Sequence, residues 1–424
     1  MGQNYFQAIP LRTSYTKKLK KFTSSLGKAI GEGETIPFAD NDISYTLKLQ
    51  NERIKEKGVE FEYEATQKET EETQFFDVAD WKDGHYASSV GFGSFKIKRL
   101  VKKNNKILYK DTLRNSFYGT VTDIVSGAHP DNEPYICPNC GADGTVAQLQ
   151  NGCPYCGTQY KMDDLLPKIT GFYFFDHLGI TRNQILIGWP LCALICTILV
   201  YIYLFNPSFR ELFPITVQEP SSDILFGPLL GTVYGFFLFM FFHTLFKIAR
   251  AIADLYRMGT ADSRKRFEKG MKKITPEFSF EYFKGKAISL IKTAIYAKDE
   301  NELACYKGEP LPDEMKDIID FNYSGIIGLK HFEEKDGFVT VELKGYFDVL
   351  SVKDDKVRFT HPVFSATFKR RTDIPVNINF TMTRISCPTC GTSFNAMKNR
   401  FCPSCGNEYE LLSDDWVLVE LKKA

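Results

Sequence analysis

The residues of this sequence that are best suited to chemistry are its paired cysteines. Eight of the eleven cysteines form four Cys-x-x-Cys pairs, each with proline after the first cysteine and glycine after the second. The pairs form two sets, in which 12 and 11 residues separate one pair from the next. The first set is Cys137, Cys140, Cys153 and Cys156, and the second set is Cys387, Cys390, Cys402 and Cys405.

Two cysteine pairs at this spacing are typical of a zinc ribbon. Each pair makes a tight knuckle, because proline favours the turn and glycine lets the backbone curl back toward the sulfurs. Two knuckles supply four thiolates for a tetrahedral Zn²⁺ site and leave no open position for a substrate. We therefore expect two structural zinc ions, in ribbons at 137–160 and 387–405. A rubredoxin-like iron site and redox dithiols are the alternatives that the same residues allow.

The charge pattern does not favour a nucleic-acid partner. The formal net charge is +1, and no cluster of basic and aromatic residues surrounds either ribbon. Cysteines that act as thiolate ligands need a reducing compartment. The two ribbons resemble each other as far as Tyr160 and Tyr409, but the other parts of the two halves are too dissimilar to establish a duplication.

Two apolar runs lie between the ribbons. Residues 185–205 are 21 residues without a charge, and 224–246 are 23 residues in which His243 is the one group that titrates near neutral pH. At 1.5 Å per residue each run spans about 30 Å as a helix, the thickness of a hydrocarbon core. The sequence therefore predicts two transmembrane helices in a lipid bilayer.

Flanking lysines and arginines predict the orientation of this hairpin. The connecting segment 206–223 has one, 161–183 has three, and 247–273 has nine. Positive charge stays on the cytoplasmic side, so we expect the loop 206–223 outside and both termini in the cytosol at the cytoplasmic membrane. The segment 247–273 is then a basic juxtamembrane linker.

Small residues recur every four positions in both apolar runs. They are Gly188, Cys192 and Cys196 in the first run and Gly227, Gly231 and Gly235 in the second. Small residues in register let helix backbones approach closely in lipid. This face either closes the hairpin or joins two copies into a homo-oligomer, and the sequence leaves both open.

The amino-terminal part divides into two predicted regions. In 1–45, apolar residues recur at helical spacing between lysines, which predicts a basic amphipathic helix or a disordered segment. Such a helix either lies on an anionic membrane or docks on its own domain. Residues 46–136 alternate apolar and polar side chains, as in Val59-Glu-Phe-Glu-Tyr63, and predict a β-rich module.

The carboxy-terminal part, 274–422, predicts an α+β domain. A helix begins after 274–279, and short helices are expected near 299–303 and at 314–321. Strands are expected at 325–332, 337–350, 357–370 and 376–386. The second ribbon interrupts the last hairpin before a final strand that starts at Asp415-Trp416.

Three features of this part carry a resemblance to a known family. They are the sequence Pro-Glu-Phe-Ser-Phe-Glu-Tyr-Phe from Pro276, the run Ala-Ile-Tyr-Ala-Lys-Asp-Glu-Asn-Glu-Leu from Ala294, and the ribbon followed by Asp415-Trp416. This part resembles the carboxy-terminal domain of the mitochondrial import-motor subunit Tim-forty-four and bacterial Tim-forty-four-like membrane proteins. The resemblance implies a nuclear-transport-factor-two-like cone with a curved sheet, an apolar pocket and a role in protein transport.

Catalytic equipment is sparse in this sequence. His331, His361 and Asp348 fall in predicted strands and can form an acid-base pair, but they are more simply read as ordinary strand residues. We therefore expect a membrane-anchored binding or scaffold protein rather than an enzyme. Its expected partners are lipid and other membrane or client proteins. A protein that binds lipid or another apolar ligand is the alternative.

Overall fold

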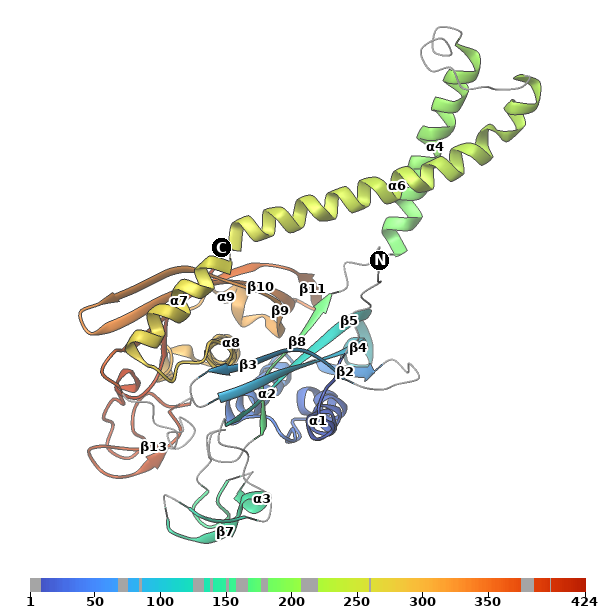
Figure 1. Cartoon of the computed structure of the whole chain (residues 1–424). Helices are drawn as coiled ribbons and strands as arrows, with labels where there is room; N and C mark the ends of the chain where they lie inside the picture. Colours follow the sequence, from blue (N-terminus) through green and yellow to red (C-terminus); the bar gives the residue numbers. More distant parts are fainter. Residues whose placement is uncertain are drawn as a thin grey trace. The chain divides into compact units, whose positions relative to one another are not determined.

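The computed structural model describes residues 9–67, 75–83, 86–124, 133–137, 140–149, 152–157, 167–176, 182–206, 220–258, 261–374, 385–396 and 398–424. The chain forms two compact units (Figure 1). One contains Met1–Asp176 and Met258–Ala424, and the other is the segment His177–Arg257 between them. Residues 207–219 of the loop predicted outside the membrane, and 376–384 of the strand predicted at 376–386, lie outside the described residues.

The amino-terminal half of the globular unit is a sheet covered by two helices. Its elements are β1 (Ile9–Pro10), α1 (Thr13–Gly31), α2 (Asn41–Glu56), β2 (Glu60–Gln67), β3 (Phe76–Asp83), β4 (Tyr86–Lys103), β5 (Lys106–Ile124) and β8 (Lys168–Asp176). The strand order is β1-β3-β4-β5-β8, and β2 pairs with β4 beside β3. A small insertion between β5 and β8 holds β6 (Pro134–Ile136), β7 (Asp143–Thr145) and α3 (Val146–Leu149).

The apolar stripe predicted in 1–45 belongs to the core of this half. Leu19, Phe22 and Leu26 of α1 are fully buried, and Gly27 brings the helix backbone against the carbonyl of Tyr63 in β2. The apolar face is therefore not available to a membrane, and the docked helix is the alternative that the structure supports. The lysines of α1 face outward.

Helix α2 corrects the prediction that 46–136 is β-rich throughout. Asp40 caps its first turn by accepting a hydrogen bond from the backbone N–H of Ile43 at 2.8 Å. Ile43, Leu47 and Ile54 then fall on one buried face, and Gly58, with φ of +63°, follows the last turn. This helix was missed because its stripe is interrupted by the buried polar residues that contact the other half.

The carboxy-terminal half has the same kind of architecture. Its elements are α7 (Ala261–Ile274), α8 (Phe280–Tyr296), η2 (Glu300–Glu302), α9 (Asp313–Lys316), β9 (Ile318–Lys335), β10 (Phe338–Lys353), β11 (Lys356–Thr360), β12 (Val363–Arg371), β13 (Ile385–Ser386), β14 (Ser393–Phe394), η3 (Leu411–Ser413) and β15 (Val417–Lys423). The strand order is β11-β10-β12-β15, with β9 paired to β10.

Three predictions for this half change in detail. The helix predicted at 314–321 ends at Lys316, because Ile318 and Ile319 begin β9. The strand predicted at 357–370 is two strands, β11 and β12, since Pro362 interrupts them and has no N–H for the ladder. The segment 247–273, predicted as a basic juxtamembrane linker, is helical in its described residues, which form the end of one long helix (Pro220–Met258) and most of α7.

The two halves turn and pair their strands in the same way. The β4–β5 turn has positive φ at Asn104 (48°) and Asn105 (61°), and the β10–β11 turn has it at Asp354 (48°) and Asp355 (59°). Positive φ at both central residues is what a tight two-residue hairpin turn of this kind requires, and asparagine and aspartate tolerate it. The two turns therefore share this conformation, and each directly follows the long strand, β4 or β10, that pairs with two or more others in its half.

The last strand of each half repeats one irregularity. In β8, Ile169 pairs with Val121 and the register then shifts; in β15, Leu418 pairs with Phe368 and the register then shifts in the same place. Ile169 also bonds the backbone of Phe38 (2.8 Å) and Asp40 (3.0 Å) in a parallel bridge. The corresponding partners of Leu418 are Cys305 and Lys307, both at 2.9 Å.

A shared turn, a shared bulge and a shared parallel bridge identify the halves as two copies of one unit. Each copy inserts its cysteine-rich segment at the same place, between β5 and β8 or between β12 and β15. We call them the amino-terminal repeat (9–176) and the carboxy-terminal repeat (280–424). The resemblance between the ribbons in the sequence thus extends to the whole fold of each half.

Buried polar contacts join the two repeats into one unit. Arg99 of β4 contacts Asp111 at 2.5 Å and Asp320 of the other repeat at 3.3 Å, and Gln50 of α2 donates to Asp320 at 3.0 Å. Lys286 of α8 lies between Asp42 (3.0 Å) and Asp415 (3.1 Å). Burial alone would lower the pKa of Lys286, but the two carboxylates raise it above its ordinary value. We call this set of contacts the repeat interface.

Candidate metal centres and membrane hairpin

The four sulfurs of each cysteine set lie together. In the first ribbon, Cys137 faces Cys156 and Cys140 faces Cys153, with 3.6 Å between the sulfurs of each pair. The second ribbon repeats this arrangement at the same 3.6 Å. Around a tetrahedral ion with metal–sulfur bonds near 2.3 Å, the sulfurs would be about 3.8 Å apart. Both sets therefore have the geometry to hold one metal ion each.

The knuckles are built as the sequence motif predicts. Gly141, Gly157, Gly391 and Gly406 all have φ between 68° and 75°, a conformation that glycine adopts without strain. Each of these glycines donates its N–H to the carbonyl of the first cysteine of its pair, at 2.8 or 2.9 Å. In the second ribbon, side-chain and backbone hydrogen bonds with Thr392 lower the pKa of Cys390 to about 6. Such bonds favour the thiolate, which is the ligand form.

The two centres differ in how they are embedded. Cys387 and Cys402 belong to the main core of the carboxy-terminal repeat, together with Phe394, Ala396 and Tyr409. The described buried residues of the first ribbon form a small core of their own, made of Cys137, Val146 and Cys153. The second centre is therefore part of the fold of its repeat, whereas the first centre is a self-contained module.

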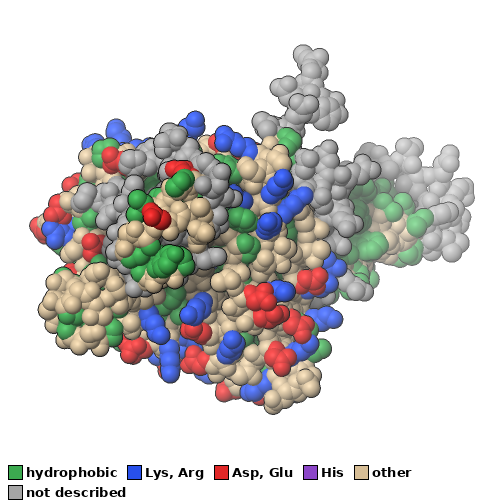
Figure 2. Space-filling view, turned by 90° about the horizontal axis from the view of Figure 1, so that it is seen from below, with side chains coloured by type: hydrophobic (Ala, Val, Ile, Leu, Met, Phe, Trp, Pro, Cys, Tyr) green, Lys and Arg blue, Asp and Glu red, His purple; other side chains and the backbone are tan. Residues whose placement is uncertain are grey.

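The segment between the repeats is a pair of antiparallel helices, α4 (Arg182–Phe205) and α6 (Pro220–Met258). Both contain a stretch, Ile185–Tyr203 and Gly227–Phe246, that is long and apolar enough to cross a membrane. A core helix of a soluble protein would be mostly buried, but 6% and 17% of these stretches are buried. In Figure 2 the described part of the hairpin shows hydrophobic side chains, whereas the globular unit carries charges of both signs.

The small residues of the hairpin lie where the two helices touch. A Cβ on Gly231 would come within 2.0 Å of the Thr197 hydroxyl, and one on Gly235 within 2.4 Å of the Ala193 Cα. Gly227 faces Tyr201, and Gly188 faces Phe239. Cys196 is buried, and the backbone of Cys192 lies 2.8 Å from the Cβ position of Gly235. Of the two roles left open by the sequence, this face serves the closing of the hairpin.

The candidate acid-base residues divide into a pair and an outlier. The carboxylate of Asp348 in β10 lies 2.6 Å from Nδ1 of His361, the residue that directly follows β11, and can accept a hydrogen bond from it. His331 lies beside Glu333 at 3.6 Å and is half exposed. Its strand partner, Glu342, is six residues from Asp348, about 20 Å along β10. The structure therefore brings together two of the three residues.

Sequence reasoning missed the buried charges of the repeat interface. Arg99 alternates with Phe95, Ile97 and Val101 on the inward face of β4, where a charged residue is out of place. Asp320 likewise lies between the buried Ile319 and Phe321. A charge in the apolar phase of a strand is the signal that would have indicated a buried partner elsewhere in the chain.

Comparison with protein-family models, with curated proteins and with solved structures finds no match to this chain.

Proposed function

We propose that this protein is a membrane-anchored cytosolic binding or scaffold protein. The observation that carries the proposal is the hairpin: two helices packed tightly on each other through glycine present large apolar side chains outward, such as Ile187 (71% exposed) and Phe237 (65% exposed). Outward apolar surface of this extent is stable in lipid and costly in water. The hairpin is then the anchor, and the globular unit is what it holds at the membrane.

Both repeats belong on the same side of that membrane. The chain enters the hairpin after Asp176 and leaves it before Met258, and the halves on either side form one compact unit. Buried contacts such as Arg99 with Asp320 cannot form across a bilayer. The charge count of the flanking segments supports the cytosolic side, as does the need of eight thiolates for a reducing compartment.

Zinc is the metal that best suits both centres. Four thiolates in a tetrahedron match structural zinc and leave no site for a substrate, so each ion acts as a folding element. Elemental analysis of the purified chain is expected to give two zinc ions per molecule. Iron, or no metal under reducing conditions, would refute this assignment.

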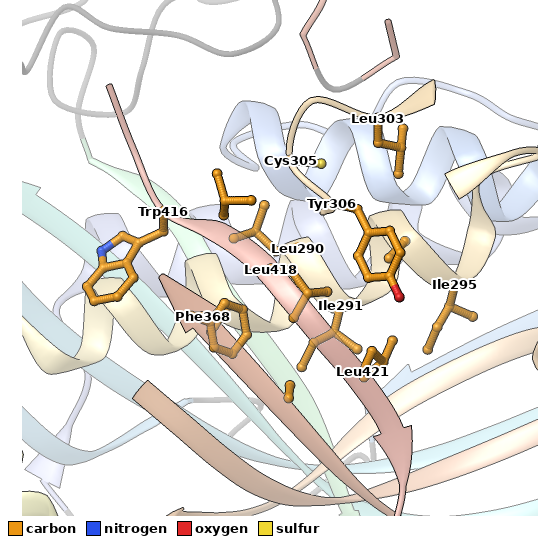
Figure 3. Close-up of a cluster of buried hydrophobic side chains, with 14 of the residues drawn as sticks. Leu290, Ile291, Ile295, Leu303, Cys305, Tyr306, Phe368, Trp416, Leu418 and Leu421 are labelled. Atoms are coloured by element: carbon orange, nitrogen blue, oxygen red, sulfur yellow. The ribbon is translucent and has the colours of Figure 1, made fainter. Parts of the chain in front are cut away.

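Surface binding is favoured over an enclosed ligand site. In the carboxy-terminal repeat, side chains of α8 such as Leu290 and Ile295 interleave with Leu418 and Leu421 of the strand beneath them (Figure 3). These side chains fill the described interior between helix and sheet with protein atoms. A role in protein transport rests on the Tim-forty-four-like resemblance of the sequence, and the fold cannot decide it because like folds serve many functions.

The proposal is tested by crosslinking in intact membranes. The full chain, expressed in its native membrane, is crosslinked with a short cell-permeable reagent and purified through a terminal tag. The expected result is that partner proteins are crosslinked to defined residues of the globular unit. A Gly231→Val variant serves as the control in which the packing of the hairpin is lost. Recovery of lipid alone, without any protein, would sink the scaffold proposal in favour of lipid binding.

A further inference from the structure

The repeats provide an internal comparison of one surface. In the carboxy-terminal repeat, the connection that follows α8 contacts the second ribbon, which is inserted between β12 and β15. The backbone N–H of Ala304 donates to the carbonyl of Ala396 at 3.2 Å, and Phe394 and Ala396 are buried in the core. The segment 393–396, which begins with β14 (Ser393–Phe394), thus contacts this connection two residues before the bridge at Tyr306.

The matching place in the amino-terminal repeat is an open pocket of about 500 Å³. The matching connection is 33–39, which leads from α1 to the equivalent bridge at Ala39. The lining includes 33–39, Ser44, Tyr45 and Lys48 of α2, Lys168 at the start of β8, and Asn395 of the second ribbon at the rim. The pocket therefore lies where the carboxy-terminal repeat holds its ribbon.

The first ribbon is poorly suited to fill this pocket. Counting from the two bridges, Pro37 takes the place of Ala304, and proline has no N–H to donate. Counting from the knuckles, Gly144 takes the place of Phe394, so the aromatic anchor is absent. Val146, which takes the place of Ala396, is already buried in the ribbon's own core. Among the described residues, the first ribbon therefore lacks the groups with which the second ribbon contacts its own repeat.

We propose that this pocket binds an extended segment of a partner protein that carries an aromatic side chain. The chemistry follows from the other repeat, where the matching connection bonds the segment 393–396 and where Phe394 of that segment is buried. Ile36, Phe38 and Tyr45 supply apolar and aromatic lining, while Ser44 and Lys48 supply polar groups at the edge. This mixture suits a peptide better than a wholly apolar ligand. The inference rests on the proposed binding function and assigns it a site.

The probe for this site is contained in the chain itself. A capped hexapeptide with the sequence of residues 391–396, Gly-Thr-Ser-Phe-Asn-Ala, copies the segment that fills the carboxy-terminal surface. Its phenylalanine is replaced by a photoreactive phenylalanine analogue. The full chain in detergent or nanodiscs is irradiated with this peptide, and crosslinked fragments are mapped by mass spectrometry. The control peptide has alanine at the phenylalanine position and carries the photoreactive group at its amino end.

Crosslinks within 33–48 are the expected result, with loss of the crosslink for the control peptide. Ser44→Trp, which fills the pocket, should abolish the crosslink, and Lys48→Tyr at the rim should weaken it. Ser24→Trp on the exposed face of α1 is the matched control and should leave it unchanged. Equal melting temperatures and metal contents show that the variants fold.

Crosslinks scattered over the surface, or crosslinks that persist in both pocket variants, would overturn the assignment. A second arm places a photoreactive residue at Lys48 in the full chain. If that residue captures 133–157 of the same molecule, the pocket belongs to the first ribbon and not to a partner. The hairpin plays no part in this readout, so a negative result here leaves the membrane anchor standing.

Discussion

Lys292 shows what one buried charge does to the stability of this protein. The ammonium group of this buried α8 residue lies 5.1 Å from the centre of the Phe172 ring, and Asp320 is the opposing charge that acts on it. Burial lowers the pKa of Lys292 to about 8, although Asp320 acts in the opposite direction. A group with a lowered folded pKa contributes stability above its unfolded pKa and loses it as the pH falls through the folded value.

The stability of the wild-type protein should therefore rise between pH 8 and the unfolded pKa of lysine. At pH 7 the protein carries the full cost of charging Lys292, at most about 3 kcal/mol from the lowered pKa. Lys292→Met removes this cost. We expect the variant to melt several degrees above wild type at pH 7, with a smaller difference at pH 9.5. A difference between the two melting curves that does not change with pH would contradict this account of Lys292.

Individual residues also show the limits of prediction. The eight ligand cysteines and the glycines of the knuckles are readable because metal geometry constrains spacing locally. The pairing of Arg99 and Gln50 with Asp320 is not, because these partners lie more than 200 positions apart in the sequence and nothing local specifies the pairing. The docked face of α1 was one of several alternatives for the same reason: an amphipathic stripe does not say which apolar surface it meets.

At the scale of elements, the two ribbons should respond differently to loss of a ligand. Cys402→Ser disturbs a centre that shares its core with Trp416 and Leu411, whereas Cys153→Ser disturbs a separate small core. Both variants should retain one metal ion. The first should lower the melting temperature of the globular unit by at least about 5 °C, and the second should leave it nearly unchanged.

Calorimetry and elemental analysis of the two serine variants check this asymmetry. Limited proteolysis adds a local readout, since the Cys153→Ser chain should be cut within 133–157 while the carboxy-terminal repeat and the rest of the amino-terminal repeat resist cleavage. Equal losses of melting temperature in the two variants would mean that the first ribbon is not the self-contained module described above.

The hairpin offers a second prediction for an element. Gly231→Val places two methyl groups where Thr197 approaches within 2.0 Å of the Cβ position, so the helices must separate. We expect a clear drop in thermal stability in detergent, whereas Leu230→Val on the exposed face should have little effect. Light scattering tests the alternative that this face joins two copies of the chain. In that case Gly231→Val would convert a dimer to a monomer and would not lower the stability of the monomer.

For the whole molecule, the repeat interface is the feature that holds two repeats as one unit. Arg99→Met removes the guanidinium that contacts the carboxylate of Asp320, which is 1% exposed, and leaves Lys292 as a more weakly coupled cation. Breaking a buried pair in this way costs about 3–5 kcal/mol. Adding Asp320→Asn removes the stranded charge and keeps the amide oxygen for Gln50, so the double variant should recover much of the loss. Denaturant titration of Arg99→Met, Asp320→Asn and the double variant in detergent measures both effects.

Additive losses in that cycle would show that the two residues are not coupled and that the interface is held elsewhere.

The α+β class, the apolar hairpin and the two cysteine centres were predictable, because each depends on a pattern within a few tens of residues. The repetition of the whole fold was not. The evidence for the repetition is the strand register and the bulge that follows Ile169 and Leu418. Backbone features of this kind can be the same in two repeats whose side chains nearly all differ. The nuclear-transport-factor-two-like cone with an apolar pocket stays a prediction from the resemblance.

The most direct test of the central claim is the sidedness of the two repeats. Trypsin is added to right-side-out and to inverted membrane vesicles that contain the full chain, and antibodies against 9–176 and 280–424 follow each repeat. Both repeats should resist carbonate extraction, survive in right-side-out vesicles and be digested together in inverted ones. Digestion of the two repeats from opposite sides, or release of the chain by carbonate, would contradict the account of a membrane hairpin that holds one cytosolic unit.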